Sequence, residues 1–327
     1  KIGRSSQAVL MASGKEDEAG QVPESVPVVS GLDDERSGKE EKTGIGAFAV
    51  GEAFTSAFSK TADFIKKEAK ELVDDIKAMT TDEKLIVPGM AFFGDSLTEY
   101  GLEMPDGWIT RLRVEYGTKA EMFGRGIAGY NSRWGKYVVP RQVNGLAFKN
   151  IRLATIWYGA NDAVMEGMEQ AVPIAEYQSN LHKLGMHLMD AAGGSQKIGI
   201  IYVTPPPVDA ETWDKKEAEK EDGQPDKRTN DRTGEYAKAC CAVAKALHVP
   251  VLDLFSLMTA EGVNYKEFLG DGLHLNGKGN AFVADKLMQL IRNAYPPLAP
   301  DALPTTSVHW RSVDYRNPSA TLGRLTL

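Results

Sequence analysis

The fold of this chain is decided by the stretch Met90-Ala91-Phe92-Phe93-Gly94-Asp95-Ser96-Leu97-Thr98. Its first four residues form an uncharged apolar run, which is typical of a strand buried on both faces of a parallel sheet. The Gly-Asp-Ser string that follows predicts a tight turn. This turn places Ser96 at the carboxyl edge of the sheet, where open α/β sheets gather their reactive groups. Ser96 is therefore a candidate nucleophile.

Short apolar runs and helical patterns alternate along the chain. The runs predicted as strands are Met90–Phe93, Ala120–Phe123, Leu153–Tyr158, Ile198–Val203 and Val249–Leu254. Helical periodicity covers Trp108–Tyr116, Ile174–Ala191, Gly234–Leu247 and Asn280–Ala294. This alternation predicts an α/β fold with a five-stranded parallel sheet and helices on both faces. The highly charged segment 211–232 predicts a solvated excursion before the next helix.

A carboxylate and an imidazole follow the last predicted strand, in the string Asp271-Gly272-Leu273-His274. Serine hydrolysis needs a hydroxyl, a base that takes its proton, and a group that fixes the tautomer of the base. We therefore predict Ser96 as the nucleophile, His274 as the base and Asp271 as the orienting carboxylate.

Two further segments would supply hydrogen-bond donors at the same edge. Gly129 ends a glycine-rich loop after the second predicted strand, and Asn161 follows the third. The backbone amides of Ser96 and Gly129, with the side-chain amide of Asn161, are the predicted oxyanion hole. Each string alone is more often an ordinary turn or helix cap. Their combination, in this order on successive strand ends, favours an active site.

Four strings resemble the first, second, third and fifth sequence blocks of the GDSL or SGNH hydrolases: Gly94–Thr98, the glycine loop ending at Gly129, Gly159–Asp162 and Asp271–His274. The chain resembles the isoamyl-acetate-hydrolysing esterase branch more closely still. The strings that carry this resemblance are Gly129–Trp134, Thr204–Pro207, Tyr236–Cys240 and His309-Trp310. The resemblance covers about Pro88 to Pro318. It implies a three-layer, flavodoxin-like fold and a metal-free esterase that uses the residues predicted above. Phe123-Gly124 departs from the branch, which more often has a polar residue there, and this leaves the shape of the acyl pocket open.

A competing motif lies in the same glycine loop, because Gly124-x-Gly126-x-x-Gly129 spells a dinucleotide-binding fingerprint. That fingerprint needs an acidic residue about 20 positions further on to bind the ribose. Between Met122 and Asn161 the sequence has no Asp or Glu. A glycine turn in a hydrolase loop is the favoured interpretation, with an NADP site as a minor alternative. The histidines show no zinc spacing, so we expect no metal or cofactor.

The chain before the resemblance has a different composition. Residues 1–44 are acidic and rich in Gly, Ser and Pro, which predicts a tail. Residues 45–84 contain an amphipathic helical pattern from about Glu52 to Met79. Packing on its own domain, docking on a partner protein and contact with a membrane surface are all open for this helix. We expect the hydrolase domain to span residues 85–297 and a C-terminal extension to span 298–327.

Composition restricts the class of protein. The 327 residues are 42% hydrophobic, have a mean hydropathy of −0.31 and contain no apolar run long enough to span a bilayer. A net charge of −7 argues against a nucleic-acid partner. Cys240 and Cys241 are adjacent and poorly placed to bridge each other, which favours a reduced compartment.

Two hypotheses follow. In the first, the chain is a serine esterase that hydrolyses small carboxylic esters through an acyl-enzyme. In the alternative, the same fold is an accessory or structural subunit of a larger, membrane-associated organellar complex, docked through residues 1–84. The first residue is Lys1 and the tail is acidic, so we expect an intracellular protein of an organelle, a mitochondrion or a plastid.

Overall fold

The computed structural model describes residues 87–146, 148–219, 227–305, 308–318 and 321. The predicted tail and amphipathic helix, residues 1–84, lie outside the described residues. The described part is built on a five-stranded sheet with the order β2-β1-β3-β4-β5. Its strands are β1 (Gly89–Gly94), β2 (Glu121–Gly126), β3 (Ile151–Trp157), β4 (Gly199–Val203) and β5 (Val251–Leu252). All neighbouring strands pair in parallel, which confirms the predicted α/β sheet.

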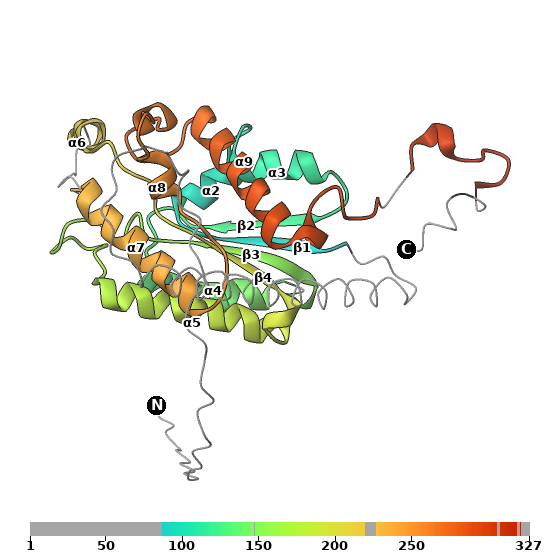
Figure 1. Cartoon of the computed structure of the whole chain (residues 1–327), viewed down its shortest axis with the longest axis horizontal. Helices are drawn as coiled ribbons and strands as arrows, with labels where there is room; N and C mark the ends of the chain where they lie inside the picture. The colour runs from blue at the N-terminus through green and yellow to red at the C-terminus, as the bar shows by residue number, and fades with distance from the viewer. Residues whose placement is uncertain (1–86, 147, 220–226, 306–307, 319–320, 322–327) are drawn as a thin grey trace, which may run out of the picture.

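Helices cover both faces of this sheet, as Figure 1 shows, and so complete three layers. One face carries α2 (Ser96–Glu103), α3 (Trp108–Tyr116), α8 (Leu254–Met258) and α9 (Gly277–Ala294). The other face carries α4 (Ser132–Asn144), α5 (Ile174–Ala192) and α7 (Asn230–Ala246). The helix α6 (Ala210–Ala218) lies beyond the end of β4. Short 3-10 turns are η1 (Phe148–Asn150), η2 (Ser195–Lys197), η3 (Tyr265–Phe268), η4 (Pro296–Leu298) and η5 (Trp310–Ser312).

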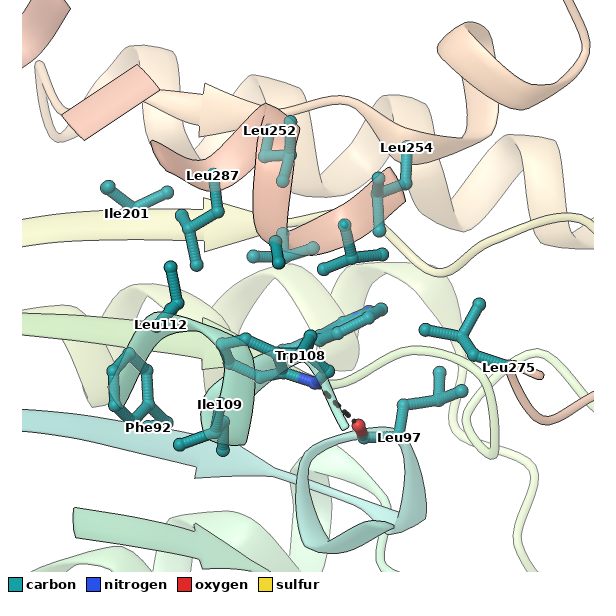
Figure 2. Packing of buried hydrophobic residues seen from close by; sticks show 14 of the residues in the cluster. Phe92, Leu97, Trp108, Ile109, Leu112, Ile201, Leu252, Leu254, Leu275 and Leu287 are labelled. Atoms are coloured by element: carbon teal, nitrogen blue, oxygen red, sulfur yellow. Dashed lines mark hydrogen bonds between the residues drawn. The ribbon is translucent and has the colours of Figure 1, made fainter. Parts of the chain in front are cut away.

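The layer between the sheet and helices α3 and α9 is packed around Trp108 (Figure 2). This indole is fully buried, stands edge-on to Phe92 of β1 at 5.2 Å between ring centroids, and donates to the Leu97 carbonyl at 2.9 Å. A buried indole N–H needs such a partner. The bond therefore ties the core directly to α2, the helix that begins at Ser96.

Most predicted elements agree with the structure, and the differences have local causes. The predicted strand Val249–Leu254 is reduced to two residues because Asp253 caps α8, its carboxylate accepting from the Ser256 amide at 3.1 Å. Sequence periodicity did not predict α4, whose 13 residues include Pro140. In the segment 211–232 most of the described residues are at least partly exposed, as predicted, but part of the segment differs from a solvated excursion. Helix α6 occupies part of that segment, and Trp213, Glu217 and Arg228 are buried.

The order β2-β1-β3 means that the chain crosses to the other side of β1 after β2. A crevice forms at such a switch point, outside the carboxyl ends of the strands, and open α/β sheets bind their ligands there. The segments leading to Ser96, Gly129 and Asn161 leave the sheet from β1, β2 and β3. Among the described residues, no helix is long and apolar enough to cross a membrane.

Candidate active site

Ser96 is the first residue of α2, directly after β1. Asp95 caps this helix, its Oδ1 accepting from the Leu97 amide at 3.0 Å. The end of β2 packs against the same turn, because a Cβ on Gly126 would lie 2.2 Å from the Glu99 nitrogen. The side chain of Ser96 is thereby held on a rigid turn at the helix N-terminus, where backbone N–H groups lack helical partners.

Ser96, His274 and Asp271 form one hydrogen-bonded chain. The Ser96 Oγ lies 2.9 Å from His274 Nε2, and His274 Nδ1 lies 2.8 Å from Asp271 Oδ2. The other carboxylate oxygen, Oδ1, accepts from the backbone amides of Leu273 at 3.0 Å and His274 at 2.7 Å. This carboxylate keeps the Nδ1–H tautomer, which leaves Nε2 free to accept the serine proton. Such an arrangement can generate an alkoxide-like nucleophile at neutral pH.

The charge of Asp271 is stabilised by two partners. Burial alone would raise the pKa of this carboxyl, but hydrogen bonds from His274 and Lys216 and the charge of the imidazole hold the pKa well below its usual range. The Lys216 ammonium binds Oδ2, the oxygen that also binds the imidazole. Asp271 therefore stays ionised throughout the pH range in which an imidazole titrates.

Two aromatic rings flank the imidazole of His274. The ring centroid of Tyr100 is 5.0 Å away and that of Trp213 is 5.8 Å away. The turn that carries His274 docks on the start of α6 through Gly272, whose φ is +92°. A Cβ there would lie 2.6 Å from the Asp209 oxygen, so this position requires glycine for two independent reasons. Packing therefore restricts both the ring and the turn that carries it.

Gly129 adopts a φ of +78° in the loop after β2, a conformation that favours glycine. The neighbouring amides are occupied, that of Ala128 by the Glu99 carboxylate and that of Tyr130 by the Ile127 carbonyl at 3.2 Å. Among the described residues, the Gly129 N–H has no hydrogen-bond partner. Gln170 fixes the other side of this peptide by donating to the Gly129 carbonyl at 2.6 Å.

Asn161 is buried after β3, and both ends of its side-chain amide are engaged. Its Nδ2 donates to the Tyr130 carbonyl at 2.8 Å, and its Oδ1 accepts from an Arg228 guanidinium nitrogen at 3.1 Å. An amide nitrogen carries two hydrogens, so the bond to Tyr130 leaves one for a ligand.

Two fully buried carboxyls, Asp95 and Asp162, lie next to these groups. The pKa of each is raised to about 7, mainly by burial, and repulsion from Asp162 contributes to the shift of Asp95. Asp162 accepts from the Ser132 amide at 3.0 Å and from the Ser132 hydroxyl, and so anchors the start of α4. Asp95 Oδ2 has no hydrogen-bond partner among the described residues. In the sequence Asp95 directly precedes Ser96 and Asp162 directly follows Asn161, but the burial of these carboxyls was not predicted.

The glycines of the competing fingerprint have a packing role. Gly124 and Gly126 lie inside β2, not on the turn after it. A Cβ on Gly124 would lie 2.6 Å from the Leu102 side chain, just as one on Gly126 would meet α2. Their small size thus allows α2 to approach the sheet, which accounts for the pattern without a dinucleotide. The described part of the chain contains no cluster of three metal-ligating side chains.

Sequence reasoning missed three residues of this site. Trp213, Lys216 and Arg228 all come from the charged segment that was predicted to be solvated. The Trp213 ring lies 5.1 Å from the Lys216 ammonium and 5.3 Å from the Arg228 guanidinium, both within cation–π range. The only signal in the sequence was a tryptophan within a strongly charged run, which is unusual for a solvated loop.

Comparison with known proteins identifies the family of the chain. Residues 92–282 match the model of the GDSL-like lipase/acylhydrolase family. The chain belongs to this family. Family membership makes it a carboxylic ester hydrolase of the GDSL type and confirms the resemblance seen in the sequence.

The chain is also similar to named proteins from an animal and from yeast. The isoamyl acetate-hydrolyzing esterase 1 homolog of Rattus norvegicus is 34% identical over 244 residues, which are 73% of this chain and 93% of the rat protein. The isoamyl acetate-hydrolyzing esterase of Saccharomyces cerevisiae is 34% identical over 230 residues, 68% of this chain and 93% of the yeast protein. The crystal structure of a lipase/acylhydrolase from Enterococcus faecalis has a TM-score of 0.48 and 23% identity, over 63% of this chain and 96% of that chain.

Proposed function

We propose that this GDSL hydrolase is a serine esterase that acts on small carboxylic esters through an acyl-enzyme. Ser96 Oγ attacks the ester carbonyl carbon while His274 Nε2 takes the hydroxyl proton. The tetrahedral intermediate collapses as His274 returns this proton to the departing alcohol oxygen. A water molecule, deprotonated by His274, then attacks the acyl-Ser96 and releases the carboxylic acid.

The observation that carries this proposal is the unbroken chain from Ser96 Oγ through His274 to Asp271, with distances of 2.9 and 2.8 Å. Asp271 holds the imidazole in the required tautomer and stabilises the imidazolium formed at each step. The amides of Ser96 and Gly129 and the Nδ2 of Asn161 would bind the oxyanion of the intermediate.

The relatives support a small ester as substrate. Proteins named for isoamyl acetate hydrolysis match this chain over nearly their whole length. Acetate esters of short alcohols are therefore the first substrates to assay, with p-nitrophenyl acetate as the chromogenic probe.

Replacing the nucleophile tests the proposal directly. Ser96→Ala should reduce turnover of p-nitrophenyl acetate by about 10⁴-fold or more, because it removes the hydroxyl that forms the acyl-enzyme. A fluorophosphonate should add one covalent label to the unaltered protein, on the peptide that contains Ser96, and none to the variant. Ser195→Ala is the matched control, since Ser195 is exposed in η2 just before β4, at the opposite edge of the sheet. Unchanged turnover in Ser96→Ala would contradict the assignment.

The alternative role, a subunit docked through residues 1–84, falls on a part of the chain that the structure does not describe. It stays a prediction, as do the organellar location and the boundaries of the tail and extensions.

A further inference from the structure

Arg228 is a buried cation next to the site. Its exposed fraction is 4%, although it follows a highly charged run. A guanidinium removed from water must be fully engaged by acceptors, or its burial is strongly unfavourable. Arg228 donates to the Ala160 carbonyl and to Asn161 Oδ1, the latter at 3.1 Å, and the Trp213 ring lies beside it. The cation is thus directed at the residue pair that follows β3.

These contacts determine which way the Asn161 amide faces. Its oxygen points to a group that can only donate, Arg228, and its nitrogen points to a group that can only accept, the Tyr130 carbonyl. If the amide were rotated by 180°, two donors would face each other on one side and two acceptors on the other. The observed orientation is therefore the only one that both neighbours satisfy.

The guanidinium also changes the strength of the amide as a donor. A carbonyl that accepts from a cation is polarised, and the N–H groups of the same amide become stronger donors in a medium of low dielectric. Trp213 and its packing help to exclude water around Arg228. The second Nδ2 hydrogen of Asn161 is thus both aimed and strengthened before any substrate binds.

We propose that Arg228 is a positioning residue of the oxyanion hole, which fixes the Asn161 amide with Nδ2 toward the oxyanion and polarises it for that contact. This inference rests on the proposed function, in which Asn161 is an oxyanion donor. Arg228 itself would not touch the substrate, so its effect should pass through Asn161.

A double-mutant cycle tests this coupling in the full chain with p-nitrophenyl acetate. Asn161→Ala should lower kcat by about 10²–10³-fold. Arg228→Met should lower kcat by about 10–100-fold with little change in KM, because the ground-state ester makes little use of the oxyanion contact. Arg228→Met in the Asn161→Ala background should cost less than about threefold further. Arg228→Lys, which keeps a cation but not the planar fork, should restore part of the loss.

Arg232→Met is the matched control. Arg232 also donates to a backbone carbonyl, that of Val164 at 2.8 Å, and lies beside an aromatic ring, Tyr236, at 5.4 Å. It has no contact with Asn161, so its loss should change kcat by less than about threefold and leave the cycle with Asn161→Ala additive. Thermal unfolding of each variant measures the structural contribution separately.

The outcomes separate the two proposals. Equal loss of kcat from Arg228→Met in both backgrounds, or no loss at all, would overturn the positioning role while leaving the esterase intact. Unchanged kcat in Asn161→Ala would remove Asn161 from the oxyanion hole and the positioning role with it. If Arg228→Met does not fold, Arg228→Lys is measured with and without Asn161→Ala instead. Its loss of kcat should be smaller than that of Arg228→Met, and it should disappear in the Asn161→Ala background.

Discussion

Among the aspartates at the carboxyl edge of this sheet, Asp271, Asp95 and Asp162 lie near the nucleophile, and folding changes their acidity in opposite directions. Asp271 is partly exposed and hydrogen-bonded to His274 and Lys216, so its pKa falls well below the usual range. Asp95 and Asp162 are fully buried, and burial raises the pKa of each to about 7. Proximity to the nucleophile therefore does not decide the charge of a carboxyl. The balance between burial and the hydrogen bonds and charges that stabilise the carboxylate decides it.

The two kinds of carboxyl also affect stability with opposite sign. A lowered pKa in the folded state means that the unfolded chain binds more protons, so Asp271 contributes stability above pH 4 that is lost as the pH falls through its folded pKa. A raised pKa means that the folded chain binds more protons. The stability contributed by Asp95 and Asp162 therefore falls as the pH rises from about 4 to about 7.

Among these three carboxyls, the largest effect on activity is expected at Asp271. In Asp271→Asn the side-chain oxygen can still accept from the Leu273 and His274 amides, so the turn survives. The amide nitrogen would face His274 Nδ1 and favour the tautomer with the proton on Nε2, which cannot accept the serine proton. We expect kcat to fall by about 10³–10⁴-fold, with some loss of thermal stability at pH 7 because the ionised carboxylate contributes stability there.

Asp285→Asn is the control for Asp271→Asn, because it removes the same charge at a different place. Asp285 lies on α9, in a groove that α9 forms with α3. Steady-state kinetics on both variants decides the matter. A loss below about tenfold in Asp271→Asn would show that the ordered imidazole does not depend on this carboxylate.

The residues of the proposed triad could be located from the sequence because each lies in a short string next to a strand or helix end. Ser96 directly follows an apolar strand, and Asp271 and His274 share one turn before α9. The bounds of α3 coincide with the predicted Trp108–Tyr116, since its apolar positions alone mark the buried face.

The positioning residues were missed for a physical reason. Local composition made the segment 211–232 look solvated, yet Arg228 is buried because Ala160 and Asn161, about 67 residues earlier in the chain, offer acceptors to it. Such a contact is tertiary, and no local pattern encodes it. The same holds for Lys216, whose partner Asp271 is 55 residues away.

The substitution Asp95→Asn tests whether a buried carboxyl at this edge has a raised pKa. Asparagine caps a helix as well as aspartate does and can keep the bond from the Leu97 amide, but it cannot ionise. The variant should lose less stability than the unaltered protein as the pH rises from 4.5 to 8, and the difference between the two melting temperatures should change by several degrees over that range. Differential scanning fluorimetry across the range measures it.

Asp162 still titrates in this variant, so the pH dependence of the melting temperature should become weaker without vanishing. The new amide nitrogen takes the place of Asp95 Oδ2, which has no partner among the described residues, and this lowers stability equally at every pH. Only the slope of the melting temperature against pH therefore tests the ionisation of Asp95. A slope equal to that of the unaltered protein would mean that Asp95 is ionised in the folded state from pH 4.5 upward.

The smallest effect is expected when the cation beside Asp271 is removed. Lys216 competes with the imidazole for Oδ2 and places a positive charge beside the site, so Lys216→Met should move the acid limb of the pH profile of kcat/KM to higher pH. The shift should be under about one pH unit because the lysine side chain is 43% exposed and its charge is screened. Lys215→Met is the control, since Lys215 pairs with Glu211 on the solvent side of α6 and should leave the limb in place. Raising the salt concentration should move the limb of the unaltered protein toward that of Lys216→Met. If the acid limb of Lys216→Met moved to lower pH instead, Lys216 would stabilise the charged imidazole. The inference that Lys216 competes with the imidazole for Asp271 Oδ2 would then be wrong.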